Sequence, residues 1–161
     1  MKNTKAKILV AIAVLTISMV STAAMEDKKD MKDITGNASI NLPVTQLKYA
    51  DTGIYGEDKS LGTLKAASAY GDLQHGAHGT FIKMPAGFVS ENHIHTGGYY
   101  AVVVSGVGVN GVPGSKDIPL PVGSYWYQKG GEYHVSKCIS QNECIFFISQ
   151  SVKFDEILEK K

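Results

Sequence analysis

The alternation of short apolar segments with turn-forming residues is the feature that most constrains how this chain can fold. From Leu42 onward, apolar segments are separated by Gly, Pro, Asn and Asp at intervals of about ten residues. No long segment shows the period of a helix. This spacing is typical of a β-sandwich or β-barrel, so we expect an all-β domain.

Strands are expected at Thr45–Tyr49, Leu61–Ala67, Gly79–Met84, Asn92–His95, Tyr99–Val107, Ser124–Gln128, Tyr133–Ile139 and Cys144–Ser149. The strand that begins at Tyr99 is apolar on both of its alternating faces, so we expect both to be buried, one against the barrel lumen and one beneath a second layer. Gly97 and Gly98 permit a tight reversal that would fold this strand back beside the preceding one. The last segment, Val152–Lys161, is expected to form a helical turn or an edge extension.

The N-terminus has the organisation of an export signal. Three lysines precede a largely apolar run from Ile8 to Val20, and small residues follow at 21–24. This run is shorter than the roughly 20 residues that a membrane-spanning helix needs. We therefore expect a signal peptide at 1–24, a flexible segment at 25–41 and one domain at 42–161. The mature protein is expected to be periplasmic or secreted, without a stable membrane anchor.

The charge of the mature chain argues against several partners. Three of the 16 lysines lie in the expected signal peptide, which leaves 13 against 15 acidic residues, a net charge near −2. The chain contains no arginine, the residue that usually clamps phosphate and carboxylate groups with paired hydrogen bonds. We therefore expect no nucleic-acid partner and no heavily phosphorylated substrate.

His93 and His95 are two residues apart in a segment that we expect to be extended. Alternate residues of a strand point to the same face with their Cα atoms roughly 7 Å apart, so the two imidazoles can share one metal ion. A third histidine, His134, follows another expected strand and a glycine-containing turn.

Together these segments resemble the two signature motifs of the cupin superfamily, G-x5-H-x-H-x3,4-E-x6-G and G-x5-P-x-G-x2-H-x3-N. The residues in register are Gly87, His93, His95 and Gly106 for the first motif, and Gly123, Gly131 and His134 for the second. The resemblance covers roughly residues 60–152. It implies a small jelly-roll β-barrel, a single cupin domain, in which His93, His95 and His134 bind a metal.

Three positions depart from the motifs. Tyr99 stands where a glutamate ligand is expected, Lys129 replaces the proline, and Cys138 replaces the final asparagine. The fourth ligand therefore stays open. The implied cofactor is one divalent transition metal, and imidazoles suit zinc, iron, manganese, nickel and copper alike.

Tyr99 is the candidate catalytic residue. A phenol with a pKa of about 10 is a reluctant anionic ligand, so we expect Tyr99 to donate to a bound molecule rather than bind the metal. Packing in the core is the alternative. Glu91 is the carboxylate nearest to His93 in sequence, and for it a position at the solvent-facing rim is favoured over metal binding.

Cys138 and Cys144 are the only cysteines, and they flank a turn signal at residues 140–143. In an exported protein this arrangement favours a disulfide across a hairpin. Metal binding by Cys138 is disfavoured, because four strand residues separate it from His134 by about 13 Å. A redox-active pair is the alternative, although the C-x-x-C spacing is missing.

Two further groups have a less specific pattern. His75 and His78 lie in a glycine-rich segment and are expected to be exposed loop residues, with a second metal site as the alternative. On the strand at 124–128, Tyr125 and Tyr127 are expected on one face and Trp126 on the other.

These features favour an exported mononuclear metal-binding cupin that acts on or oxidises a small organic molecule at a three-histidine site. A metal-dependent oxygenase is a candidate activity, but whether the protein is an enzyme stays open. A non-catalytic sensor or binding protein for a small ligand or metal, and a metal-free barrel that acts in envelope assembly, are the alternatives, since a fold does not determine a function. The expected partner is a small molecule, and a homodimer is a candidate assembly.

Overall fold

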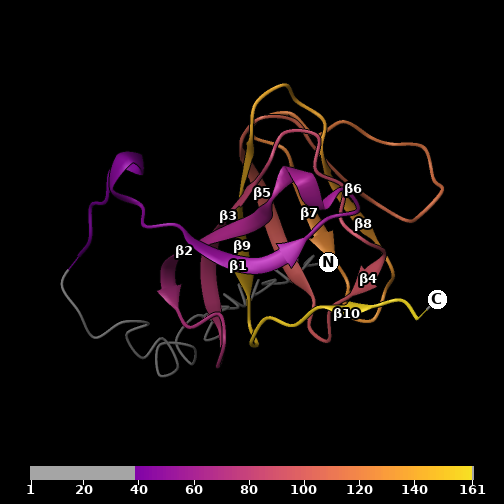
Figure 1. Cartoon of the computed structure of the whole chain (residues 1–161). Coiled ribbons are helices and arrows are strands. Elements are labelled where there is room, and N and C mark those ends of the chain that lie inside the picture. Colours follow the sequence, from indigo (N-terminus) through magenta and orange to yellow (C-terminus); the bar gives the residue numbers. More distant parts are fainter. Residues whose placement is uncertain (1–38, 161) are drawn as a thin grey trace, which may run out of the picture. The chain divides into compact units, whose positions relative to one another are not determined.

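The computed structural model describes residues 39–160, and most of their regular structure is strand (Figure 1). The elements are, in order, the 3₁₀ helix η1 (Val44–Gln46), β1 (Ala50–Tyr55), the 3₁₀ helix η2 (Lys59–Leu61), β2 (Thr63–Gly71), β3 (His78–Met84), β4 (His93–Ile94), β5 (Tyr99–Ser105), β6 (Gly108–Gly111), β7 (Tyr125–Gln128), β8 (Val135–Cys138), β9 (Cys144–Gln150) and β10 (Ile157–Leu158). The predicted all-β fold class is confirmed. The predicted signal peptide at 1–24 lies outside the described residues.

The strands form one large antiparallel sheet and two short ladders. The large sheet has the order β1-β2-β3-β9-β5-β7, and the ladders are β10–β4 and β6–β8. Isolated bridges between Val89 and Lys137 and between His93 and His134 join the two ladders. A cavity is lined by the inner face of the large sheet and by β4 with its flanking segments, so these two layers enclose it. No helix of the described part is long and apolar enough to cross a membrane.

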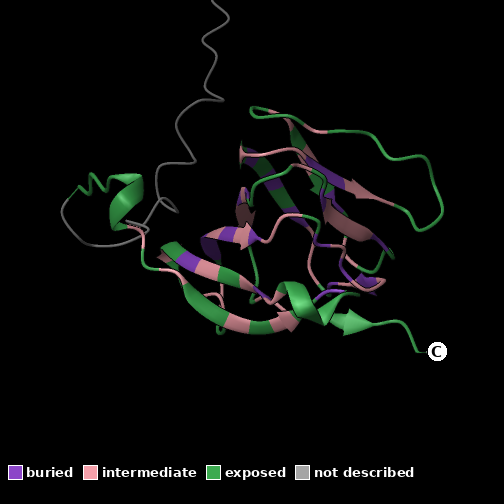
Figure 2. Cartoon of the chain, turned by 45° about the horizontal axis from the view of Figure 1, so that its top comes forward, coloured by how far each residue is buried: buried purple, intermediate pink, exposed green. Residues whose placement is uncertain are grey.

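The burial of β5 alternates along the strand, as Figure 2 shows for several strands. Tyr99 and Val103 are buried, whereas Tyr100 and Val102 are 60% and 41% exposed. The prediction that both faces would be buried is wrong, because no layer of described residues covers the outer face of β5. Its outer residues instead lie beside those of β7, with the rings of Tyr100 and Tyr127 4.9 Å apart.

Two other expectations about strands are also wrong. Residues 45–49 do not form a strand; η1 occupies their start, and the first strand is β1. Asp51 and Gly53 are residues typical of turns, and they obscured β1 in the sequence. In the structure Gly53 has φ of 73° and lies where the pairing of β1 with β2 shifts register. In addition, β5 does not fold back beside β4. It pairs with β9 and β7, whereas β4 pairs with β10.

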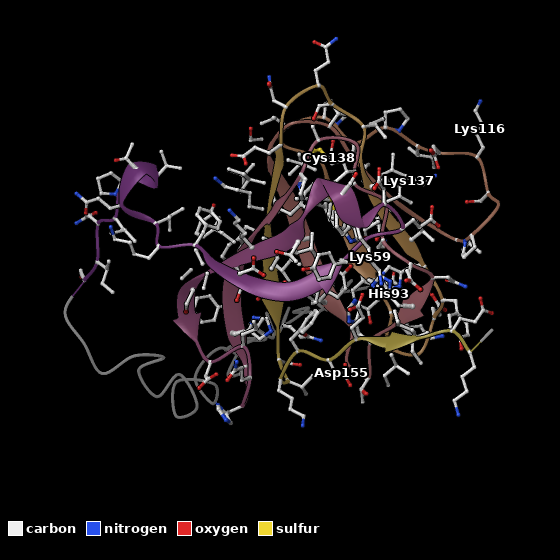
Figure 3. The ribbon with its side chains drawn as sticks, in the orientation of Figure 1. Lys59, His93, Lys116, Lys137, Cys138 and Asp155 are labelled. Atoms are coloured by element: carbon white, nitrogen blue, oxygen red, sulfur yellow. A yellow bond between two sulfur atoms is a disulfide. The ribbon has the colours of Figure 1, made fainter. Side chains whose placement is uncertain are left out.

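The apolar core lies between the layers. Its main cluster consists of Met84, Phe88, Val103, Cys138, Cys144 and Phe146. The two cysteines form a disulfide with a Cα–Cα distance of 5.7 Å, which joins the end of β8 to the start of β9. Figure 3 shows Cys138 toward one end of the barrel and His93 and Asp155 toward the other. Two residues of the core cluster, Met84 and Phe146, also line the cavity.

Candidate metal centre and cavity

Backbone pairing brings His93 and His134 together from distant parts of the chain. The His93 N–H donates to the His134 carbonyl at 3.2 Å, and the His134 N–H donates to the His93 carbonyl at 3.0 Å. Directly paired residues of antiparallel strands project to the same face. The two imidazoles accordingly lie side by side, with ring centroids 4.2 Å apart.

His95 completes the group from the next inward position of the same extended segment. Its ring centroid lies 4.8 Å from that of His93 and 5.1 Å from that of His134. Its backbone carbonyl accepts the Gly131 N–H at 2.8 Å. Gly131 has φ of 76°, a conformation that favours glycine, so this glycine of the second motif helps to anchor a histidine of the first.

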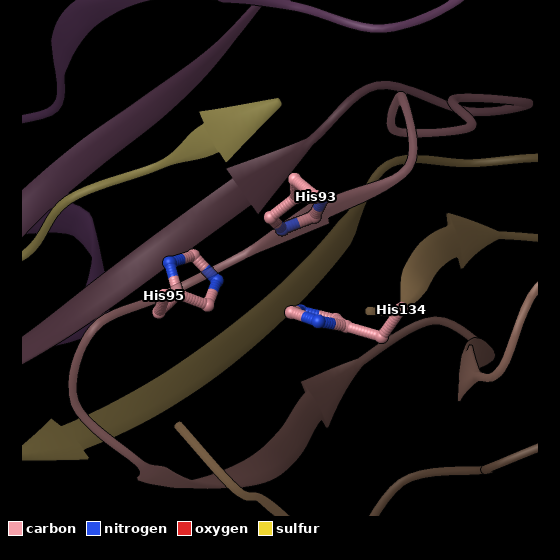
Figure 4. Close-up of side chains that lie close together, drawn as sticks. All are labelled: His93, His95 and His134. Carbon is pink, nitrogen blue, oxygen red and sulfur yellow. The ribbon is translucent and has the colours of Figure 1, made fainter. Parts of the chain in front are cut away.

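Hydrogen bonds to carbonyls select one tautomer of each imidazole. The Nδ1 atoms of His93 and His134 lie 2.8 and 3.1 Å from the carbonyl oxygens of Glu91 and Glu132, and that of His95 contacts the Asp155 carbonyl. Because a carbonyl only accepts, each Nδ1 carries the proton and each neutral ring keeps its lone pair on Nε2. In Figure 4 the three rings face one another.

Burial keeps the three rings neutral. Desolvation lowers the pKa of His93 to about 4. It also lowers the pKa of His134, to about 3, where repulsion from His93 adds to the effect. The pKa of His95 is lowered by the same desolvation. At neutral pH the Nε2 lone pairs are therefore available to a cation.

The donor set fits a transition metal. One ligand atom from each of the three histidines lies within 4.8 Å of those of the other two, and no Asp, Glu or Cys of the described residues joins this group. Three neutral imidazoles suit zinc and other divalent first-row metals, and leave coordination positions open for water or a ligand.

Tyr99 lies beside these rings, as the sequence suggested. Its hydroxyl is 3.5 Å from His134 Nε2 and 3.5 Å from the indole Nε1 of Trp126, which donates to it. Complete burial raises the pKa of Tyr99 to about 12. The phenol thus stays protonated at neutral pH and is suited to donate a hydrogen bond rather than to act as an anionic ligand.

A cavity of about 560 Å³ adjoins the centre, a size typical of small-molecule sites. His93, His95 and Tyr99 form part of its wall. Most of the remaining wall is apolar and includes Ile54, Leu64, Ile82, Phe146, Ile148 and Phe154. A largely apolar molecule can therefore lie next to the three histidines.

The segment 151–159, which we name the C-terminal strap, closes the site in a way that sequence reasoning missed. The Phe154 N–H donates to the Leu73 carbonyl at 2.8 Å, and an Asp155 carboxylate oxygen accepts the Thr96 N–H at 2.8 Å. Farther along, β10 pairs with β4. The strap thereby brings the Phe154 ring to 5.2 Å from that of His95 and places Glu156 in the cavity wall.

Only one signal in the sequence pointed to this arrangement. Phe154 and Glu156 are two residues apart and therefore share a face in an extended segment. Because the surrounding residues are charged, this alternation does not distinguish a strand from a helical turn. The sequence therefore predicts either a helical turn or an edge extension for this segment. The edge extension is what β10 provides.

The other candidate residues have mixed outcomes. Glu91 contributes its backbone carbonyl to His93 and is not in the histidine group. His75 is exposed, as expected. His78 is not an exposed loop residue, since it begins β3 and is 1% exposed; its ring contacts Thr80 and Gln150 at 2.9 and 3.2 Å. Trp126 faces the cavity while its neighbours at 125 and 127 face outward, as predicted.

Comparisons with known proteins agree with this architecture. The family model described as a domain of unknown function, DUF4437, matches residues 56–157. No curated protein matches the chain. Among solved structures, the polyketide cyclase RemF from Streptomyces resistomycificus aligns with a TM-score of 0.62 at 12% identity, over 77% of this chain and 87% of that one.

Two further structures support the same fold. An RmlC-like cupin from Shewanella frigidimarina aligns with a TM-score of 0.53 at 19% identity, over 71% of this chain and 91% of that one. A chain from the complex of Rhodobacter sphaeroides SigE with the anti-sigma ChrR aligns with a TM-score of 0.51 at 14% identity, over 68% of this chain and 51% of that one. The chain therefore belongs to the DUF4437 family and has the cupin fold.

Proposed function

We propose that this protein is an exported mononuclear metal-binding cupin that acts on or oxidises a small organic molecule at the three-histidine site. The observation that carries the proposal is the shared orientation of the rings. All three Nδ1 atoms are engaged by backbone carbonyls, so all three rings keep their lone pair on Nε2. These Nε2 atoms lie beside a largely apolar cavity, and the Tyr99 hydroxyl is 3.5 Å from that of His134. Orientation of a ligand histidine by a hydrogen bond to its other nitrogen is a recurring feature of metal sites.

The protein's own groups have distinct parts in the proposed reaction. A divalent metal at this site would supply Lewis-acid chemistry and, if it is redox-active, electron transfer. The apolar wall excludes water and strengthens electrostatic interactions at the reacting molecule. Tyr99, neutral and beside His134, donates a hydrogen bond or a proton to that molecule. This role follows from its position and raised pKa.

The structural relatives support action on a small molecule, because one of them is a polyketide cyclase. The alternative function is a non-catalytic sensor or binding protein. In its favour, another relative comes from a complex with the anti-sigma ChrR, and the described residues place no carboxylate among the histidines as a base. Turnover of a small molecule separates the two functions.

Export and assembly are part of the same proposal. The disulfide Cys138–Cys144 is typical of oxidising compartments outside the cytoplasm. The mature protein should begin within a few residues of Ala24, as mass spectrometry of the native protein can test.

For the assembly we propose a homodimer through the outer face of β5 and β7. This face carries no charged residue and exposes Tyr100, Tyr125 and Tyr127, so a second copy complements it. Light scattering after gel filtration gives the mass.

Elemental analysis of purified protein tests the proposed function. We expect about one transition-metal ion per chain, lost in His134→Ala as fully as in His93→Ala, because each residue supplies one of three ligands. His75→Ala is the matched control, since this histidine is exposed and outside the group. Full metal content in His134→Ala would show that the second motif has only a structural role.

A further inference from the structure

Glu156 differs from the other charged residues around the cavity. Four charged side chains line it, namely Lys48, Asp51, Asp72 and Glu156. The first three belong to exposed residues, whereas the side chain of Glu156 is only 18% exposed. Its charge is therefore the one least screened by water and the one that a bound molecule meets inside the cavity.

The protein provides the Glu156 carboxylate with no close donor. Its Oε1 lies 4.0 Å from His93 Nδ1, beyond hydrogen-bond distance, and that Nδ1 is already engaged with the Glu91 carbonyl at 2.8 Å. No hydrogen bond to the Glu156 side chain occurs among residues 39–160. The two exposed carboxylates are different, because Asp51 accepts the Gly53 N–H and Asp72 accepts the Gln74 N–H, both at 2.8 Å.

Other polar groups of the wall are occupied by neighbours. Ser90 Oγ accepts the Ser136 N–H at 2.9 Å, and the Ser136 hydroxyl donates to Asn110 at 2.8 Å. The Gln150 amide lies between His78 and the Gly97 carbonyl. A partly buried carboxylate without a donor is costly, and a bound molecule that brings a donor relieves that cost.

We propose that Glu156 determines the ligand class of the cavity, which takes a largely apolar molecule bearing an amine or hydroxyl donor and discriminates against carboxylates and phosphates. The inference rests on the proposed function in that the cavity is taken as the ligand site beside the three histidines. The only cationic side chain of the wall, Lys48, is exposed, so in the metal-free protein no buried side chain of the wall compensates an anionic ligand. The apolar wall accommodates the hydrocarbon part.

The test uses three probes that share one apolar cage: 1-adamantanemethylamine, 1-adamantanemethanol and 1-adamantanecarboxylate. Trp126 is the only tryptophan of the chain and lines the cavity, so its fluorescence reports binding. Metal-free protein is used at neutral pH, so that no probe binds a metal. We expect the amine and the alcohol to bind at least about tenfold more tightly than the carboxylate.

Glu156→Gln keeps the shape of the side chain and removes its charge. In this variant the preference for the amine over the carboxylate should fall to within about threefold, with the amine losing more affinity than the alcohol. Asp72→Asn, the control, removes a charge from an exposed residue and should keep the wild-type preference, because water screens that position. Circular dichroism and thermal unfolding of both variants verify that they are folded.

Three results would overturn the inference: equal or tighter binding of the carboxylate by the wild type, an unchanged preference in Glu156→Gln, or no response of Trp126 to any probe. The metal content of the same preparations is measured before the metal is removed. Purified protein without a transition metal would contradict the proposed function but not the ligand class. Equal affinity for the amine and the carboxylate would contradict the ligand class but not the proposed function.

Discussion

At the scale of single residues, the backbone rather than side chains orients the histidines. The carbonyls of residues 91, 132 and 155 engage the three Nδ1 atoms. Replacement of the Glu91 or Glu132 side chain therefore leaves these hydrogen bonds in place. The geometry of the three-histidine group therefore depends on the path of the backbone.

The metal-free protein should lose stability in mild acid because of these histidines. The pKa values of His93 and His134 are about 4 and about 3 in the folded protein, against an ordinary 6.5. As the pH falls below 6.5 toward 4, the unfolded chain binds protons that the folded protein does not, so the free energy of unfolding decreases. We expect a loss of the order of 2 kcal/mol per histidine.

Urea denaturation at several pH values, in the presence of a chelator, measures this effect. His134→Ala should show a shallower dependence than the wild type over the same pH range, since one of the titrating groups is gone. A wild-type stability that stays constant between pH 6.5 and 4 would contradict the burial of neutral rings.

Tyr99→Phe separates chemistry from binding. The change removes one hydroxyl and keeps the ring that packs against His95 and Trp126. Metal content should stay at the wild-type level, while turnover of a substrate, once found, should fall roughly 100-fold, as for other positioned proton donors. Loss of the metal would instead identify the phenol as a ligand, and unchanged turnover would remove its proposed role.

At the scale of elements, the C-terminal strap has the greatest effect on the site. It supplies a carbonyl to His95, an aromatic ring beside it and Glu156 in the cavity wall. The Asp155 carboxylate holds the strap to Thr96 through the backbone N–H and the hydroxyl. A displacement of this segment would therefore change the position of the His95 ring directly.

Asp155→Ala tests the strap. Loss of both contacts to Thr96 should weaken metal binding about tenfold, a usual effect when the support of a ligand histidine is removed. Asp117→Ala is the matched control, because this exposed residue lies between β6 and β7 and its ion pair is with Lys137 of β8. Chelator competition gives the affinities, and equal values for the two variants would exclude a positioning role for the strap.

The sequence predicted some elements well for identifiable reasons. Strand β9 begins with a continuous apolar run, Cys144–Ile148, and β3 contains Phe81, Ile82 and Met84. The predicted bounds of both strands agree within one residue. The three histidines could be predicted as one group because their spacing matches the two motifs. The positions of Glu156 and the C-terminal strap could not be predicted. They depend on the pairing of β10 with β4, two strands far apart in the sequence, and such a pairing produces little pattern in the local sequence.

At the scale of the whole molecule, Cys138 of the disulfide and His93 of the histidine group lie toward different ends of one barrel (Figure 3). The disulfide belongs to the core cluster, and neither of its cysteines lines the cavity. Core and site should therefore respond to different substitutions.

The double variant Cys138→Ala/Cys144→Ala should be destabilised by about 2 kcal/mol, near the lower end for disulfides because the loop that it closes is short. Its metal affinity should match that of the wild type. Denaturant unfolding and metal titration on the same samples measure both quantities. A parallel loss of metal affinity would show that the core and the site are coupled.

Anomalous diffraction from crystals of the purified protein tests whether three Nε2 atoms bind one metal ion. We expect a single anomalous peak bonded to Nε2 of His93, His95 and His134, at about 2.0–2.1 Å from each. Tyr99 and Glu156 should lie outside bonding distance of it. Metal binding by the three Nε2 atoms would be contradicted by any of three results: a peak bonded through Nδ1, a peak elsewhere, or metal-loaded protein without density among the three histidines.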